Sequence, residues 1–215
     1  GTLCLNDNLE SFNLSNEICN RYGLDTISVG CAVAFAIECF ENGLVTPQDT
    51  GGMELTRGNH EWIVGLSRAI ARREGFGEVL ADGEERAARH IGKGAEEYAV
   101  HVQGEEVPMH DPRLNPGLAT SYQIDATPGR HTQMGSWTVE AEFPPPGLVD
   151  VPEGFDKYKA EGKGEVHATV SNAYLAAPAA GVCMFGWTVV QPSCLTDSLT
   201  HVTGQTFTQD DILKI

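Results

Sequence analysis

The stretch YGLDTISVGC, residues 22–31, brings three chemically useful residues into one short corner. Gly23 suits the left-handed backbone that ends a helix, and Asp25 suits the cap of the next helix. A carboxylate at this point can also accept charge-assisted hydrogen bonds from the N–H groups of a ligand. Cys31 falls at the start of the second helix, where a thiolate has a lowered pKa and can bind metal. The simpler interpretation is a glycine cap, an aspartate cap and a buried thiol.

Two later stretches also carry residues that can do chemistry. His131 lies in PGRHTQ, residues 128–133, and a neutral histidine can pass a proton near pH 7. A lone histidine after Pro-Gly is otherwise a surface loop residue. Cys183 follows Gly-Val and is either a metal-binding thiolate or a small buried hydrophobic residue.

The sequence has six cysteines, at positions 4, 19, 31, 39, 183 and 194, which could form disulfides, stay reduced or bind metal. No Cys-x-x-Cys pair occurs, and the chain has no secretory features. Reduced thiols or metal ligands are therefore favoured over disulfides, although no complete metal site is visible.

Hydrophobic periodicity predicts that helices position these residues. The predicted helices span residues 8–22, 28–42 and 59–74, shorter pieces at about 77–81 and 83–92, then about 165–178, a segment near 181–191, and 208–215. The 28–42 helix is apolar nearly all round and is expected to be buried. Consecutive prolines predict that residues 140–154 are extended or loop.

From about residue 99, Pro and Gly residues interrupt the helical pattern of the sequence. This change predicts a domain boundary, which gives domains 1–102 and 103–215. The expected fold is mainly α: two irregular multi-helical domains with long loops. The chain begins without Met, so we expect a processed chain, and it stops inside a predicted helix, where a natural domain seldom ends.

Composition excludes several classes of function. The 215 residues include 41% hydrophobic and 20% charged residues, a globular balance, with a formal net charge of −16. Such a surface repels phosphate backbones and disfavours nucleic-acid binding. No apolar run reaches the roughly 18 residues that span a bilayer, and the start resembles no signal peptide. We therefore expect a cytoplasmic protein without a membrane span.

Four segments together resemble the tungsten-dependent aldehyde:ferredoxin oxidoreductase family, in the family's order. They are NRYGLDTISVGCAVAFAIECFENGLVT, the run from GFGEVLADGEERAARHIG to HVQGEEVPMHDPRLNPGLATSY, PGRHTQ, and THVTGQTFTQDDILKI. HVQGEEVPMHDPR resembles the family's K-G-x-E-x-P-x-x-D-P-R segment, with Gln103 in place of Lys. The resemblance implies helical domain 2 for residues 1–102, with its N-terminal part missing. It implies helical domain 3 for 103–215, with its C-terminal part missing.

The family has two Asp-x-x-Gly-Leu-(Asp/Cys) motifs, and each reaches a pterin. The resemblance implies that Asn20, Gly23, Leu24 and Asp25 form the first copy, with Asn replacing the leading Asp. In the second copy, Pro178 replaces the leading acid. The copy ends in Gly181, Val182 and Cys183, and Cys183 matches the fourth ligand of a 4Fe–4S cluster.

The resemblance also implies roles for His131 and Cys31. His131 matches a histidine that the family places near the metal, whereas His110 and the other histidines have no comparable context. The HDPR segment is expected to fix a turn. The family commonly has Gly where this chain has Cys31. The tungsten subunit of benzoyl-coenzyme A reductases is thought to place a cysteine on the metal, so Cys31 is a possible tungsten ligand.

The function implied is a fragment of a tungsten or molybdenum bis-pterin, iron–sulfur oxidoreductase that acts on an aldehyde or related carbonyl compound. Its partners would be the missing N-terminal pterin-binding domain of the same polypeptide and ferredoxin or another electron-transfer protein. We expect neither pterin nor cluster in the fragment alone. The alternatives are an aromatic acyl-coenzyme A (benzoyl-CoA) reductase subunit, a non-catalytic helical scaffold, and a generic thiol or metal-binding protein.

Overall fold

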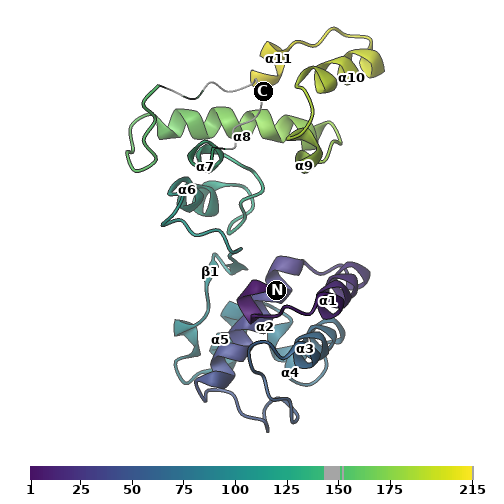
Figure 1. Ribbon diagram of the computed structural model, residues 1–215, viewed down its shortest axis with the longest axis vertical. Helices are drawn as coiled ribbons and strands as arrows, with labels where there is room; N and C mark the ends of the chain where they lie inside the picture. Colours follow the sequence, from purple (N-terminus) through teal and green to yellow (C-terminus); the bar gives the residue numbers. More distant parts are fainter. Residues whose placement is uncertain (143–150, 152, 215) are drawn as a thin grey trace. The chain divides into compact units, whose positions relative to one another are not determined.

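The computed structural model describes residues 1–142, 151 and 153–214 (Figure 1). Residue contacts divide the chain into two compact units, Gly1–Met109 and His110–Ile215. Each unit is described on its own below. The division predicted from the sequence, after residue 102, falls within the first unit, and the assignment of its two parts to family domains stays a prediction.

The first unit is built around one buried helix, α2 (Thr26–Glu41) (Figure 1). Around it lie η1 (Thr2–Cys4), α1 (Leu9–Tyr22), α3 (His60–Arg72), α4 (Phe76–Leu80), α5 (Glu84–Ile91) and η2 (Ala95–Glu97). Val33, Ala36 and Cys39 of α2 are almost wholly buried. The all-round apolar pattern of α2 therefore reflects burial on every side, as predicted from the sequence.

A short hairpin ends the first unit, where the family-like segment HVQGEEV lies. β1 (His101–Val102) pairs antiparallel with β2 (Glu105–Glu106). Gln103 and Gly104 turn between them with φ of 54° and 85°, as a two-residue hairpin loop of this twist requires. Buried Glu106 accepts the Glu84 N–H through Oε1 at 2.9 Å and so ties β2 to the start of α5.

The second unit consists of six helices within the described residues (Figure 1). They are α6 (Gly117–Ile124), α7 (Ser136–Glu140), α8 (Lys163–Ala179), α9 (Met184–Trp187), α10 (Ser193–Thr203) and α11 (Gln209–Leu213). Buried Glu140 accepts the Gly117 N–H at 2.8 Å and Lys163 Nζ at 2.8 Å. One carboxylate thus joins α6, α7 and α8.

The mainly α prediction is confirmed, with differences in detail in the second half. Helices α6, α7 and α10 were not predicted, because they are short or rich in Thr, Ser and Gly. Only the four-residue α9 lies within the helical segment predicted near 181–191. Of the predicted loop 140–154, Glu140 ends α7, and residues 143–150 and 152 lie outside the described residues. The predicted capping of the last helix by Thr208 and Asp211 is present.

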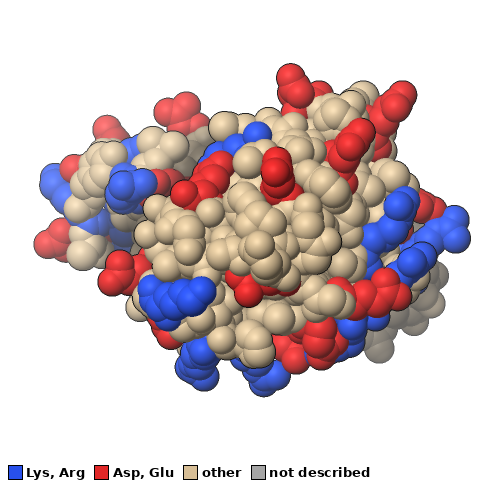
Figure 2. All heavy atoms as spheres, turned by 90° about the horizontal axis from the view of Figure 1, so that it is seen from below, with Lys and Arg blue, Asp and Glu red and all other residues tan. Residues whose placement is uncertain are grey.

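Charged residues of both signs lie on the surface of the molecule. On the face drawn in Figure 2, Lys and Arg are scattered among Asp and Glu and do not gather into a basic stripe. None of the helices in the described part of the chain is long and apolar enough to cross a bilayer.

Gly77 provides a test of the packing of α4 against α3. A Cβ added at Gly77 would lie 2.1 Å from the backbone carbon of Ala69. We expect Gly77→Ala to lower the free energy of unfolding by about 1–3 kcal/mol, because the helices must move apart. Urea denaturation measures the loss.

Gly65→Ala is the matched control for this substitution. Gly65 is also helical, but the nearest atom to its added Cβ is 3.8 Å away. Alanine should leave stability unchanged or raise it by up to about 1 kcal/mol. Equal effects of the two substitutions would contradict the close approach of α4 to α3.

Candidate functional site

The first glycine corner joins α1 to α2 through a left-handed residue. Gly23 has φ 69°, and the next N–H, of Leu24, bonds back to Cys19 O at 2.9 Å. This is the Schellman arrangement of a helix C-terminus. Asp25 then caps α2, its Oδ2 accepting the N–H of Ser28 at 3.0 Å and the Ser28 hydroxyl at 3.1 Å. The capping roles of Gly23 and Asp25 are therefore present, and Asn20 is exposed near the end of α1.

The second glycine corner, after α8, repeats this geometry. Gly181 has φ 82°, and Val182 N–H bonds back to Ala177 O at 2.8 Å. Cys183 then occupies the capping position of α9, as Asp25 does for α2. The two motif copies adopt one local backbone form, even though the leading acid is absent from both. In each, the last residue presents an acceptor atom at a helix start.

Cys183 lies at the N-terminus of α9. Its side chain is exposed, and the backbone N–H groups of Gly186 and Phe185 point to its sulfur and lower the pKa of the thiol. N–H groups at a helix start favour the ionised form of a thiol. Cys194 of α10 is also exposed but begins no helix corner of this kind.

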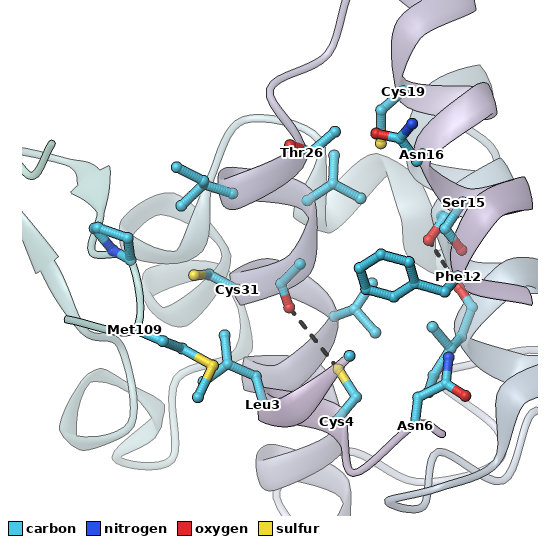
Figure 3. Close-up of a pocket in the computed structure, with 18 residues that line it drawn as sticks. Leu3, Cys4, Asn6, Phe12, Ser15, Asn16, Cys19, Thr26, Cys31 and Met109 are labelled. Carbon is cyan, nitrogen blue, oxygen red and sulfur yellow. Dashed lines mark hydrogen bonds between the residues drawn. The ribbon is translucent and has the colours of Figure 1, made fainter. Parts of the chain in front are cut away.

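Cys31 is buried in the first unit and faces a cavity of about 260 Å³. Its thiol donates to Val107 O at 3.4 Å. Figure 3 shows the cavity with Cys31 and Met109 on one side and Phe12 of α1 on the other. Cys31 is therefore a buried thiol that lines a cavity.

Asp25 and Cys31 do not line the same cavity. Asp25 and Ser28 border a different cavity of about 220 Å³, which Asp82, Glu105 and Glu106 also line. The sequence suggests that Asp25 and Cys31 contact one cofactor, but in the fold the two side chains line different cavities. Within the described residues, no three His, Cys, Asp or Glu side chains are grouped to hold a metal ion. A metal centre here would need ligands from elsewhere.

His131 lies in a ring cluster that the sequence did not reveal. Its imidazole is half-buried and stacks on His110 with ring centroids 4.2 Å apart, and both rings lie 5.9 Å from Trp137. His131 Nδ1 is buried and has no hydrogen-bond partner among the described residues. Burial, aided by His110 and Arg130, lowers the pKa of His131 to about 4. The imidazole is therefore neutral at pH 7.

The HDPR segment holds the backbone of His110 in place. Asp111 pairs with the Arg113 guanidinium and accepts the Arg113 N–H at 2.8 Å, which forms the expected turn. The Tyr122 hydroxyl donates to His110 O at 2.8 Å. The position of His110 directly before this fixed turn is the one sequence signal for its place in the ring cluster.

A family model for aldehyde ferredoxin oxidoreductase, domains 2 and 3, matches residues 1–215. The chain belongs to this family. It is 31% identical over 217 residues to a tungsten-containing aldehyde ferredoxin oxidoreductase of Pyrococcus horikoshii, covering 99% of this chain and 34% of that protein. It therefore spans about a third of the length of this relative.

Two further proteins are similar to this chain, one in sequence and one in structure. An aliphatic sulfonate oxidoreductase, WOR-like subunit, of Pyrococcus furiosus is 36% identical over 123 residues, covering 54% of this chain and 20% of that protein. The solved active-site complex BamBC of benzoyl coenzyme A reductase, with bound 1,5-dienoyl-CoA, aligns with a TM-score of 0.62. It is 20% identical and covers 91% of this chain and 34% of that chain. The structural similarity to BamBC shows that the two chains share this helical fold.

The ring cluster yields a titration prediction. His110→Gln should raise the pKa of His131 above about 4, because one of the groups that lowers it is removed. The unfolded histidine takes up its proton near pH 6.5, so folding is destabilised as the pH falls from 6.5 toward 4. The substitution should reduce this acid destabilisation. NMR titration of the imidazole signals measures the pKa directly.

His90→Gln is the control for this titration, because His90 is exposed on α5 in the other unit. It should leave the His131 titration unchanged. A His131 pKa that stays near 4 after His110→Gln would show that the ring contact contributes nothing to it.

Proposed function

We propose that the chain is the helical part of a tungsten or molybdenum bis-pterin, iron–sulfur enzyme that oxidises aldehydes and passes electrons to ferredoxin. The observation that carries this proposal is the repeated glycine corner, which presents Asp25 and Cys183 at equivalent positions in a chain of this family. The remaining partner is the N-terminal pterin-binding domain of the same polypeptide. Electron transfer to ferredoxin places the enzyme in the cytoplasm.

The reaction sets the tasks of the protein. An aldehyde and a water molecule give a carboxylate, three protons and two electrons. The bound metal, pterins and cluster would supply the two-electron chemistry and the path to ferredoxin, while the protein binds, orients and moves protons.

The described residues fit these tasks at three points. Cys183 offers an exposed thiol whose pKa is lowered by backbone N–H groups, as the fourth cluster ligand requires. Asp25 offers a carboxylate at a helix start, which can accept pterin N–H groups in addition to its capping bonds, since a carboxylate has about four acceptor sites. Gly23, Leu24, Gly181 and Val182 would set the backbone for both contacts, and Asn20 would lie beside the first.

His131 would act as the proton carrier. It is neutral at pH 7, and because its pKa of about 4 favours release, it would hold a proton from the oxidation only transiently and pass it on. Its buried Nδ1 lacks a partner among the described residues, which leaves an acceptor or donor for a substrate or water.

A second candidate function is reduction of an aromatic acyl-coenzyme A compound. One observation favours it: Cys31 faces a cavity, as a thiol ligand of the metal would need to do. The two functions differ in the sulfur count around the metal. X-ray absorption of the holoenzyme and of Cys31→Ser distinguishes them, because only a ligating Cys31 changes the first shell.

The cluster proposal predicts the iron content of the full-length protein purified without oxygen. The wild type should hold tungsten or molybdenum with about four irons, and Cys183→Ser should lose most of the iron. Cys194→Ser is the matched control, and its iron content should stay unchanged. Metal analysis measures both, and a folded wild-type protein free of metal would support the scaffold alternative.

The proton-carrier proposal predicts a selective loss of turnover. His131→Ala in the full-length enzyme should lower kcat about a hundredfold or more while metal and iron contents stay unchanged. His60→Ala, at an exposed histidine of α3, is the control and should be neutral. Unchanged turnover in His131→Ala would reject the proton-transfer role.

A further inference from the structure

A histidine of α8 and an aspartate form a buried pair in the second unit. His167 lies on α8 and Asp125 directly follows α6, and their side chains are 8% and 6% exposed. His167 Nε2 lies 3.2 Å from Asp125 Oδ1. Both residues lie outside the four family-like segments of the sequence, so the family resemblance gives neither of them a role.

The other ring nitrogen of His167 binds the backbone of α7. The Ser136 N–H donates to His167 Nδ1 at 3.4 Å. A backbone N–H can only donate, so Nδ1 is the acceptor and the ring proton lies on Nε2, where it faces the Asp125 carboxylate. Asp125 therefore orients the ring, and the ring holds the first residue of α7.

Gly135 lets the imidazole of His167 approach the backbone directly before α7. Gly135 has φ 111°, and a Cβ added there would lie 2.5 Å from the Cε1 atom of His167. A larger residue would push the ring away and lengthen its bond to the Ser136 N–H. The close packing and the hydrogen bond thus act on the same point, the start of α7.

Polar contacts join α7 to α8 at both ends of α7 (Figure 1). Glu140, its last residue, accepts Lys163 Nζ at 2.8 Å, and Ser136, its first residue, donates to His167. Lys163 and His167 are one helical turn apart on α8, as Ser136 and Glu140 are on α7. A helix of five residues is far shorter than the roughly 12–15 residues that make an isolated helix stable, so these tertiary contacts decide where α7 lies.

α7 in turn carries one wall of the histidine stack. Trp137 follows Ser136 directly and is buried, and its ring centroid lies 5.9 Å from those of His110 and His131. A displacement of the start of α7 would therefore move the indole relative to both imidazoles. His131 would then gain contact with water where it now faces the indole.

We propose that His167, oriented by Asp125, is a positioning residue that keeps α7 and its Trp137 against the stacked His110 and His131. The proposal rests on the proposed role of His131 as a proton carrier and adds the residues that control its surroundings.

The expected consequence is a change in the pKa of His131. Burial is the main reason that this pKa is lowered to about 4, and the neighbouring groups His110 and Arg130 lower it further. Loosening α7 reduces the burial of the imidazole. The pKa of His131 should therefore rise toward 6.5, its ordinary value.

The wild-type protein alone tests the tautomer of His167. In the full-length protein with isotope-labelled histidine, NMR at pH 7 should show a proton on Nε2 of His167 and none on Nδ1. The signals that disappear in His167→Asn identify the residue. A proton on Nδ1 would overturn the proposal, because Nδ1 could not then accept the Ser136 N–H.

His167→Gln and His167→Asn separate the two bonds of the ring. The glutamine amide reaches the place of Nε2 and leaves no acceptor for the Ser136 N–H, whereas the asparagine oxygen takes the place of Nδ1. We expect His167→Gln to raise the pKa of His131 by about one unit or more and His167→Asn to change it by less than about half a unit. NMR titration of the His131 imidazole in the full-length protein measures both.

His201→Gln is the matched control, because His201 is an exposed helical histidine on α10 of the same unit. It should leave the titration of His131 unchanged. An unchanged pKa of His131 in His167→Gln would overturn the proposal, as would equal rises in the glutamine and asparagine variants.

The pH dependence of turnover separates this proposal from the proposed function. If His131 carries protons, kcat should fall as the pH drops through its pKa, and His167→Gln should move this fall to higher pH by the same amount as the pKa. A raised pKa without such a movement would reject the proton carrier and leave the positioning role of His167 supported. A movement of the kcat profile with an unchanged pKa of His131 would overturn the positioning role alone.

Discussion

A left-handed glycine followed by an acceptor side chain is the constraint on which both motif copies depend. A Cβ added at Gly23 or Gly181 would meet no atom within 4 Å, so a steric clash does not explain the glycines. Their positive φ angles explain them, because other residues rarely adopt this backbone conformation. The positive φ lets the following N–H reach a carbonyl five residues back, which ends the helix within one residue. The chain can then begin a new helix at once, with Asp25 or Cys183 at its first free N–H groups.

The same corner explains why structural and ligand-binding roles coincide. Free N–H groups at a helix start stabilise negative charge, whether the charge belongs to a capping carboxylate or to a thiolate. At Asp25 the charge holds α2 in place, and α2 is the core of its unit. At Cys183 the same arrangement lowers the pKa of a thiol on a four-residue helix, where capping contributes little to the core. The two corners therefore share a backbone form but differ in how much their last side chain contributes to the core.

The long, strongly periodic helices and the glycine corners could be predicted from the sequence, because both depend on residues that are close together along the chain. The short helices α6, α7 and α10 could not, because tertiary contacts such as those of Glu140 hold them. The split between Asp25 and Cys31 follows from helix geometry: six positions at 3.6 residues per turn lie about 120° from alignment. The stacking of His110, His131 and Trp137 depends on loop packing, which periodicity does not encode.

The boundary between the two units falls between a cavity-lining residue and a residue of the histidine stack. Met109 lines the apolar cavity of the first unit, and its neighbour His110 stacks on His131 in the second. A trans peptide bond holds consecutive Cα atoms 3.8 Å apart, so the cavity-lining Met109 and the stacked His110 are covalent neighbours. The Tyr122 hydroxyl and the Asp111–Arg113 pair fix the backbone just beyond that link. Each part of the HVQGEEVPMHDPR segment therefore makes a structural contact. Glu106 of its hairpin bonds to the start of α5, Pro108 and Met109 line the cavity, and His110 stacks on His131.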